Sequence, residues 1–300
     1  MRILGLVWVA MLAAGCSVSK KTAVVPTEKP IPALNATKEQ LVERYNKQAG
    51  AITSLNATVS LKLTAGSAYS GVIEQYHEVN AFILAQRPAD IRMIGQAPVV
   101  AKNIFDMVSD GTTFSVFIPS KNKFITGPSY FERRTDKPIE NLRPQHLVDA
   151  LLWTPIPEHA PVLIEEDEEG AKRFYVLTVV RPGGHGLAVM GWEIGSKIYF
   201  DRADLHVARI ETFGPVGRLD SDAQYSGAIP AGATTYPASI LLSRPSQDYK
   251  LQIDVKKLTV NETIPADRFV LKQPEGTDLV RVTDEAKDSN DQKDSKEQQP

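Results

Sequence analysis

The first part of the chain changes from a helical hydrophobic period to a strand period. Apolar residues first recur three or four positions apart, which is typical of an amphipathic helix: Leu41, Tyr45, Ala49, Ile52 and Leu55. Thr37 and Gln40 have the spacing of a capping box, so the helix is expected to begin there. From Leu55 to Ala65 every second residue is apolar and the residues between them are polar. This alternation predicts a half-buried strand.

Short runs typical of strands, each followed by turn residues, continue through the rest of the chain. In the first half they cover residues 71–86, 91–96, 104–109, 112–118 and 123–126, with a hairpin signal at Asp110-Gly111. In the second half they cover residues 173–180, 187–200, 205–213, 218–226, 236–243 and 249–260. Residues 144–153 predict a second helix, with Pro144 at its start.

These runs together predict a mainly β (α+β) fold, with about ten to twelve antiparallel strands and only two or three helices. A sheet of that size tends to curl or to close. Because the strands alternate polar and apolar residues, one face of the sheet is expected to be wet and the other apolar. A strongly curved sheet with an apolar concave face would form an apolar cavity. The chain shows no repeat that would indicate a propeller or a solenoid.

The N-terminus has the pattern of an export signal. Arg2 is followed by residues 3–14, which are almost all apolar, and then by small residues. A membrane-spanning helix needs about 20 apolar residues, and this run is shorter. Residues 1–15 are therefore predicted to be a cleaved signal peptide.

Cys16 is the single cysteine of the chain, and it follows this signal directly. The sequence from Leu12 to Cys16, LAAGC, resembles a bacterial lipobox, although Ala13 stands where leucine is most frequent. The resemblance implies that Cys16 becomes an acylated N-terminus. Each buried CH₂ contributes about 0.8 kcal/mol, so two or more acyl chains anchor a protein firmly. Ser17 then favours the outer membrane, with the protein facing the periplasm. The alternative is a free or buried thiol.

Composition divides the chain into four parts and gives no electrostatic partner. Residues 16–36 are expected to be a lipidated N-terminus and flexible linker, residues 37–283 the β domain, and residues 284–300 a disordered charged tail. The 34 basic and 36 acidic residues nearly cancel, so nothing favours nucleic acid as a partner. The tail could contact an envelope protein, but a solvated tail explains its charge equally.

Three stretches, in this order, resemble the LolA/LolB-like superfamily of periplasmic lipoprotein carriers and their outer-membrane receptors. They are FILAQRPADIRM at residues 82–93, DMVSDGTTFSVFIPSKNKFITG at residues 106–127, and NETIPADRFVLKQPEGTDLVRV at residues 261–282. The resemblance covers residues 37–127 and 240–282, and no motif secures the middle of the chain. It implies an unclosed β-barrel, with helices that form a lid over an apolar cavity for the acyl chains of lipoproteins or lipids.

The resemblance also gives Arg87 a role. In the carrier, the arginine of the Arg-Pro pair helps to hold the lid closed, and Arg87 occupies that position. An arginine can do so by donating several hydrogen bonds to carbonyls of the lid. The alternative for Arg87 is a solvated residue of a β-turn. A permanently acylated Cys16 departs from a soluble carrier and favours a receptor-like, anchored protein, whereas the motifs resemble those of the carrier more.

Alternating apolar positions near these motifs are the candidate lipid contacts. They are Leu61, Leu63, Phe82, Leu84, Ile91, Met93, Phe114 and Val116. Ordinary core packing explains each of them equally well, because the sequence does not report empty volume.

No pattern in the chain indicates catalysis, a metal or a cofactor. The five histidines lie apart and form no ligand spacing, and there is no nucleophile, phosphate-loop or dinucleotide motif. The acidic run at residues 165–169 is expected to be a solvated hairpin tip. The sequence therefore predicts a non-catalytic, outer-membrane-anchored lipoprotein that binds acylated ligands and assists lipoprotein or lipid transport. The alternative is a scaffold or interaction module whose β core is filled.

Overall fold

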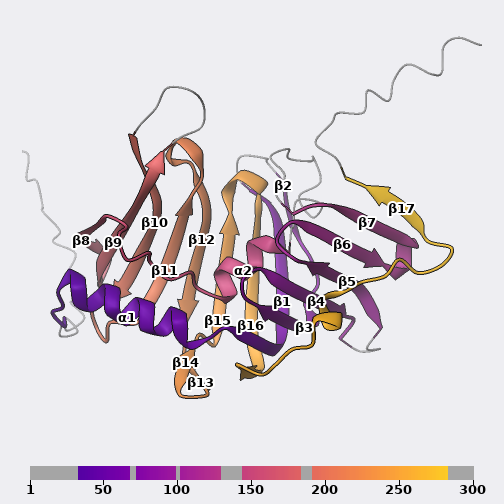
Figure 1. Cartoon of the computed structure of the whole chain (residues 1–300), viewed down its shortest axis with the longest axis horizontal. Coiled ribbons are helices and arrows are strands. Elements are labelled where there is room, and N and C mark those ends of the chain that lie inside the picture. The colour runs from indigo at the N-terminus through magenta and orange to yellow at the C-terminus, as the bar shows by residue number, and fades with distance from the viewer. Residues whose placement is uncertain (1–32, 68–71, 99–101, 130–143, 184–190, 283–300) are drawn as a thin grey trace, which may run out of the picture. The chain divides into compact units, whose positions relative to one another are not determined.

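Figure 1 shows a computed structural model of the chain, which describes residues 33–67, 72–98, 102–129, 144–183 and 191–282. The chain divides into two units, residues 1–32 and residues 33–300, and every described residue belongs to the second. The predicted signal peptide, Cys16 and the C-terminal tail lie outside the described residues. Within the described part, no helix combines the length and the apolar character that a membrane span requires.

One large curved antiparallel sheet forms the body of this unit (Figure 1). Its 15 strands follow the order β17-β7-β6-β5-β4-β3-β1-β16-β15-β12-β11-β10-β9-β8, and β2 pairs with β1. The strands of the first half are β1 (Ser54–Ser67), β2 (Val72–Gln75), β3 (Val79–Gln86), β4 (Asp90–Gln96), β5 (Asn103–Ser109), β6 (Thr113–Ile118) and β7 (Lys123–Pro128). The two ends of this order, β17 and β8, do not pair with each other, so the sheet is not closed into a barrel.

The second half of the chain supplies the other side of the sheet. Its strands are β8 (Val162–Glu169), β9 (Lys172–Gly183), β10 (Gly191–Asp201), β11 (Val207–Phe213), β12 (Leu219–Ser226), β15 (Ser239–Arg244), β16 (Tyr249–Val260) and β17 (Asp278–Arg281). Strands β13 (Ile229–Ala231) and β14 (Thr234–Tyr236) form a separate small hairpin. The long pairing of β1 with β16 joins the two halves, with a bulge at Thr58/Val59.

Two helices pack on one face of the sheet (Figure 1). Helix α1 (Lys38–Ala51) begins with the predicted capping box, in which Thr37 and Gln40 exchange side-chain and backbone hydrogen bonds. Helix α2 (Gln145–Leu151) follows Pro144, as predicted. Both helices bury their apolar stripes in a single large core together with the sheet. The expected fold class and its two covering helices are therefore confirmed.

The opposite face of the sheet carries charged networks. Arg92 makes a two-pronged ion pair with Asp106, at 3.1 and 2.7 Å, and donates a third hydrogen bond to the Arg268 carbonyl at 2.9 Å. Across the sheet, Arg209 pairs with Asp222 at 2.8 Å and with Glu211 at 2.7 Å. In these pairs each charged side chain finds its hydrogen-bond partner on the sheet itself, beside solvent. This face therefore needs no covering helix.

The structure corrects three local predictions. Residues 165–169 belong to strand β8 at the edge of the sheet rather than to a hairpin tip, and the turn follows at Gly170. Residues 71–86 form two strands, β2 and β3, because β2 pairs with the far end of β1. The sequence patterns also missed β17, which pairs in parallel with β7. Of the predicted strand at residues 187–200, residues 187–190 lie outside the described part.

Candidate functional site

The face of the sheet under the helices is a continuous apolar surface. Antiparallel partners directly opposite each other share a face. Ile83 of β3 lies opposite Met93 of β4, which lies opposite Met107 of β5. On the other side of the sheet, residues in register across β16, β15 and β12 extend the same surface: Ile253, Ile240 and Tyr225. All six side chains are buried.

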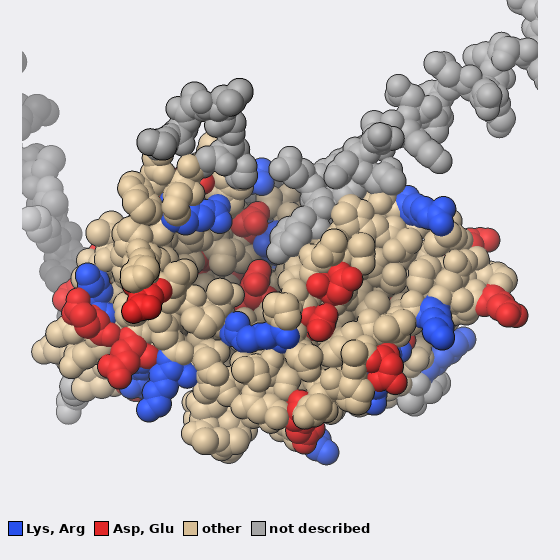
Figure 2. Space-filling model, viewed as in Figure 1, with Lys and Arg blue, Asp and Glu red and all other residues tan. Residues whose placement is uncertain are grey.

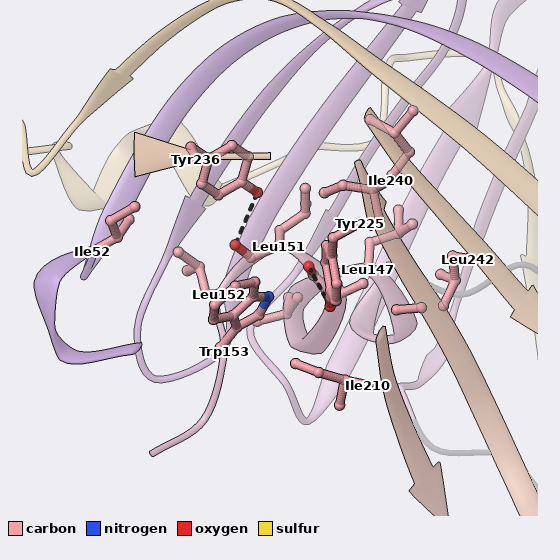
Figure 3. Close-up of a cluster of buried hydrophobic side chains, with 14 of the residues drawn as sticks. Ile52, Leu147, Leu151, Leu152, Trp153, Ile210, Tyr225, Tyr236, Ile240 and Leu242 are labelled. Atoms are coloured by element: carbon pink, nitrogen blue, oxygen red, sulfur yellow. Dashed lines mark hydrogen bonds between the residues drawn. The ribbon is translucent and has the colours of Figure 1, made fainter. Parts of the chain in front are cut away.

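The helices and the segment after α2 cover this surface from one side. Figure 3 shows Leu147, Leu151, Leu152 and Trp153 from this region in one buried cluster with Ile210, Ile240 and Leu242 of the sheet. We name α1 together with residues 145–156 the helical cover. Its buried apolar residues are Leu41, Tyr45, Ala49, Leu147, Val148, Ala150, Leu151, Leu152, Trp153 and Ile156.

The two parts of the helical cover are joined to each other. The Tyr45 ring stacks on the Trp153 ring with centroids 5.9 Å apart, and the Tyr45 hydroxyl donates to the Thr154 carbonyl at 3.0 Å. The Asn46 side chain donates to the Ile156 carbonyl at 3.1 Å and accepts from the Ile156 amide at 2.8 Å. The paired hydrogen bonds of Asn46 fix both parts in one register, so α1 and residues 152–156 form one unit.

Arg87 fastens this unit to the sheet. Its guanidinium donates hydrogen bonds to the carbonyls of Ala49, at 3.1 Å, and Ile52, at 3.4 Å, at the end of α1, and to the Trp153 carbonyl beyond α2. The last four carbonyls of a helix have no partner within the helix, so a side chain that reaches them satisfies groups that would otherwise need water. One side chain from the β3–β4 turn therefore contacts both parts of the helical cover.

Two tyrosines, one from strand β12 of the sheet and one from strand β14 of the small hairpin, hold α2 in the same manner. The Tyr225 hydroxyl donates to the Ala150 carbonyl at 3.2 Å, and the Tyr236 hydroxyl donates to the Leu151 carbonyl at 2.9 Å (Figure 3). Both side chains are buried, and this burial raises the pKa of each hydroxyl. The hydroxyls accordingly keep their protons and remain donors throughout the ordinary pH range.

Asn261 closes the end of α1. Its side chain donates to the Ala51 carbonyl at 2.7 Å and accepts from the Thr53 amide at 2.8 Å. Its backbone lies in the left-handed region with a φ of 59°, a conformation that asparagine tolerates better than most residues. The closing segment of the chain thereby fixes the point at which the first helix turns into the first strand.

The structure shows a small pocket at one end of the helical cover. A pocket of about 20 Å³ lies beside the end of α1, α2 and β14, lined by residues that include Ile52, Trp153 and Tyr236. A water molecule needs roughly 10–15 Å³, whereas pockets for small organic ligands measure about 300–1,000 Å³. This pocket therefore has no room for an acyl chain while the helical cover is in place.

A charged group lies on α2 near this region. Asp149 keeps an exposed surface, yet desolvation by the surrounding protein raises its pKa, and the positive charges of Arg244 and Arg87 act in the opposite direction. Arg244 is buried and faces the Asp220 carboxylate at 3.6 Å. Asp149 is thus near enough to Arg244 and to Arg87, which also holds the helical cover, for their charges to act on its pKa.

The structure brings together six of the eight predicted lipid contacts. Strand pairing places Leu61 and Leu63 of β1, Ile91 and Met93 of β4, and Phe114 and Val116 of β6 on the face toward the helical cover. Phe82 and Leu84 alternate with the buried residues of β3 and lie on the opposite face, where the Phe82 side chain is 42% exposed. These two residues therefore lie apart from the other six, and contact of the eight residues with a lipid stays a prediction.

Sequence patterns did not find the other residues that hold the helical cover. Asn46, Tyr225, Tyr236 and Asn261 are separated by up to about 200 positions along the chain, and each acts on a backbone carbonyl. Every residue has a backbone carbonyl, so no spacing of residue types along the sequence indicates which carbonyl a side chain will contact. The one available signal was a tyrosine on a strand face that is otherwise apolar, as at Tyr225.

The described residues contain no cluster of three or more side chains suited to a metal ion. The histidines found there are dispersed; His146 contacts the Tyr249 hydroxyl at 3.0 Å, and His206 pairs with Asp204.

Comparisons with known proteins give similar folds and no close relative. No family model matches the chain, and no curated protein matches it. A LolA superfamily protein from Nitrosomonas europaea is 13% identical, with a TM-score of 0.48 over 79% of this chain and 99% of that chain. A DUF1329 family protein from Desulfovibrio piger is 13% identical, with a TM-score of 0.48 over 77% and 94%. A domain named as an outer membrane lipoprotein-sorting protein, from Vibrio parahaemolyticus, is 8% identical, with a TM-score of 0.44 over 76% and 94%.

The topology of the chain itself defines the class of fold. A curved antiparallel sheet remains open between β8 and β17, and helices cover its apolar face. These are the features that the sequence resemblance implied. The chain is therefore an open, curved β-sheet protein whose candidate site is an apolar sheet face under a fastened helical cover.

Proposed function

We propose that this protein binds acyl chains of lipoproteins or lipids between the sheet and the helical cover, and that it assists their transport in the cell envelope. The observation that carries the proposal is the manner in which the cover is held. Arg87, Tyr225 and Tyr236 fasten it through hydrogen bonds to its backbone carbonyls. Such contacts are separate from the strand pairing, so the cover can leave while the sheet stays intact.

The energies are of comparable size. Each hydrogen bond contributes about 0.5–1.5 kcal/mol net, or about 1.5–3 kcal/mol when one partner is charged. Burying a long acyl chain contributes about 0.8 kcal/mol per CH₂, which is on the order of 10 kcal/mol for a common membrane lipid chain. Release of the cover also exposes its own buried apolar residues, so a ligand has to take their place against the sheet as well as offset the lost hydrogen bonds.

The proposal includes Arg87 as the latch of the cover and Cys16 as an acylated membrane anchor. The contacts of Arg87 with both α1 and the segment after α2 support the first role. The sequence around Cys16 and the following Ser17 supports anchoring at the outer membrane. The protein then acts at a membrane surface without covalent chemistry.

The small size of this pocket favours a second candidate function. A pocket of about 20 Å³ is also what a fully packed scaffold would show. In that case the sheet presents its outer face or its edges to a partner complex, and the helical cover never leaves. The two functions differ in one measurable property, which is uptake of an acyl ligand.

A fluorescent fatty acid tests the proposed function. The sample is residues 17–300, secreted with a conventional signal peptide that is cleaved. We expect a dansyl-labelled undecanoic acid to bind it saturably. The bound dansyl group should receive excitation energy from Trp153 in the helical cover. Trp192→Phe leaves Trp153 as the sole tryptophan of this protein. Palmitate should compete with the probe.

Two bulky substitutions provide the matched control. Leu63→Trp adds volume on the face toward the cover, and Phe82→Trp adds the same side chain on the opposite face. Because each variant adds a tryptophan, its binding is read from the anisotropy of the dansyl group and not from energy transfer. Leu63→Trp should weaken probe binding about tenfold or more by occupying the space, while Phe82→Trp should leave it unchanged. If both substitutions have equal effects on probe binding, or if the native chain shows no saturable binding, the scaffold function is supported instead.

A further inference from the structure

The pocket at the end of the helical cover lies where three separate parts of the chain meet. Its walls come from the end of α1, from the end of α2 with the two residues that follow it, and from strand β14 with the residue after it. Figure 3 shows Ile52, Leu152 and Tyr236, one from each of these parts. Strand β14 pairs only with β13, so no strand pairing joins the three parts to one another. The pocket is therefore a joint held by side chains.

The hydrogen bonds that fasten the helical cover converge on this pocket. The three carbonyls that accept from Arg87 all belong to residues of its lining, which are Ala49, Ile52 and Trp153. The Tyr236 hydroxyl, from the opposite wall, donates to a fourth carbonyl of the lining at 2.9 Å. An occupant that enlarges the pocket therefore has to separate the groups that hold the cover closed.

The lining of the pocket favours an apolar occupant. Among the described residues that line it, none is charged, and most are aliphatic or aromatic. Burying a carboxylate or a phosphate there without a partner would cost several kcal/mol, whereas each buried hydrocarbon group contributes about 0.8 kcal/mol. The volume of about 20 Å³ is enough for one group of that size. The end of a lipid that fits this pocket is thus its methyl end.

Two uncharged polar side chains stand at the edge of the pocket. Gln48 of α1 is partly exposed and Thr235 of β14 is exposed, and both belong to the lining. Neither side chain makes a hydrogen bond to another residue in the described part of the chain. Both can therefore donate to an ester or a carboxylate that stays at the surface. We name the pocket together with Gln48 and Thr235 the seam.

The hairpin β13–β14 is the wall of the seam with the fewest ties. It forms a sheet of its own, apart from the large sheet, and it is held by buried side chains such as Ala231 and Tyr236. The end of α1, in contrast, continues directly into β1 and is fixed by Asn261, which donates to the Ala51 carbonyl at 2.7 Å. The seam therefore opens more readily by a shift of the hairpin than by a shift of the end of α1.

The outside of the hairpin presents no charge to an approaching hydrocarbon chain. Residues 226–243 contain no Lys, Arg, Asp or Glu, and Figure 2 accordingly shows the hairpin in tan. Water is bound less strongly to such a surface than to charged groups, so a hydrocarbon chain reaches it with a smaller desolvation cost. The hairpin side of the seam thus suits the approach of a lipid chain.

Behind the seam the apolar face of the sheet begins at once. The Trp153 ring meets the Tyr225 ring edge to face, with centroids 5.1 Å apart. Tyr225 lies opposite Ile240 in the strand register, and Ile240 lies opposite Ile253. A chain that passes Trp153 therefore next meets the buried surface that runs across β12, β15 and β16.

We propose that an acyl chain enters the apolar site through the seam, methyl end first, and that its polar end stays at Gln48 and Thr235. This inference rests on the proposed function and adds to it a route and a direction for the chain. Because the bonds of Arg87 end on residues of the seam, entry of the chain and release of the latch are one event.

Two reversible bridges test the route. Residues 17–300 contain no cysteine, so an introduced pair reacts alone. Gln48→Cys with Thr235→Cys lets a bis-methanethiosulfonate reagent bridge the seam, and a reductant removes the bridge. Arg44→Cys with Asp204→Cys is the matched control. Arg44 donates to the Asp204 carbonyl at 3.3 Å, so this bridge ties the other end of α1 to the sheet and leaves the seam free.

The readout is quenching of Trp153 by a stearic acid that carries a doxyl group. Trp192→Phe in every variant leaves Trp153 as the sole tryptophan of residues 17–300. The bridge at the seam should slow the association of the fatty acid about tenfold or more relative to the same variant after reduction. The control bridge should leave the association rate unchanged.

The position of the doxyl group tests the direction of the chain. At equilibrium, a doxyl group next to the carboxylate should remain beside Trp153 and quench its fluorescence strongly. A doxyl group near the methyl end should have moved past Trp153 and quench it less. Equal quenching by the two probes, or the reverse order, would overturn the proposed direction.

Failure of this inference and failure of the proposed function give different results. If the native chain is quenched saturably but the bridge at the seam has no effect, or only the control bridge slows association, the chain enters by another route, such as the departure of α1. The inference is then wrong and the proposed function stands. If the native chain shows no saturable quenching, both are contradicted.

Discussion

Arg87→Leu should make the amide hydrogens of α1 and of residues 152–156 exchange about 30- to 1,000-fold faster, while the thermal midpoint stays near that of the native chain. Arg87 donates hydrogen bonds to carbonyls of Ala49, Ile52 and Trp153. Losing them should lower the free energy of opening the cover by about 2–4 kcal/mol. The sheet retains its core and its ladder, so global unfolding should be affected much less. Hydrogen exchange followed by mass spectrometry measures the difference by segment.

Two further variants make the result specific to Arg87. Arg87→Lys keeps the positive charge and removes the planar fork, so it should show an intermediate effect. Arg92→Leu removes an arginine from the next strand on the other face, where it pairs with Asp106, and should leave exchange in the helical cover unchanged. If Arg87→Leu simply lowers the thermal midpoint and speeds exchange everywhere, Arg87 is a structural residue of the turn and not a latch.

Cys16→Ala should move most of the protein from the membrane fraction to the soluble fraction. The expected effect is large because two or more acyl chains contribute most of the membrane affinity, at about 0.8 kcal/mol per buried CH₂. Labelling cells with an alkyne analogue of palmitate should mark the native chain and should not mark the variant. Fractionation of cell envelopes measures the distribution.

Ser17→Asp is the control for sorting. It retains Cys16, so the protein should remain labelled and membrane-bound but should move toward the inner membrane. Cys16→Ala could also stay on membranes because its signal peptide is not cleaved. That form carries no label and is recognised by its greater mass. If the processed, unlabelled variant still sediments with membranes to the native extent, the anchor lies elsewhere and the acylation proposal is wrong.

The elements that could be predicted from sequence are those whose pattern depends on near neighbours. Helix α1 and strand β1 were predicted closely, because capping and alternation are local signals. The Asp110-Gly111 turn was also predicted, and the Asp110 carboxylate accepts from the Thr113 amide at 2.7 Å, which lowers the pKa of Asp110. Repetition of such signals predicted about ten to twelve strands, fewer than the 15 of the large sheet, because short and edge strands carry weak patterns. The open sheet was implied by the family resemblance.

The face of strand β3 could not be predicted in this manner. Residues 81–85 are all apolar, so no alternation indicates which side chains face the core. Pairing with β1 decides it, and places Ile83 inward opposite Ala57 and leaves Phe82 outward. The largest side chain lies on the outer face because the small alanines on either side of Ile83 fit closely under the helical cover.

The acidic strand β8 and the contacts of Arg87 show two other limits. Strand β8 is an edge strand, and charged side chains on an edge prevent further pairing, so its composition resembles that of a loop.

The resemblance of the Arg-Pro pair predicted that Arg87 would reach carbonyls of the covering helices, and the hydrogen bonds agree with this geometry. Which carbonyls it reaches depends on tertiary packing between residues up to 66 positions apart.

Native mass spectrometry, followed by lipid extraction, tests most directly whether the helical cover admits an acyl chain. The sample is residues 17–300 secreted into the periplasm without the lipobox cysteine, so that any acyl chain detected is a bound ligand. We predict a population heavier than the bare chain by the mass of a lipid or acylated species, which a competing fatty acid displaces. A single mass equal to that of the bare chain, unchanged by excess fatty acid, would contradict the account and favour a packed scaffold.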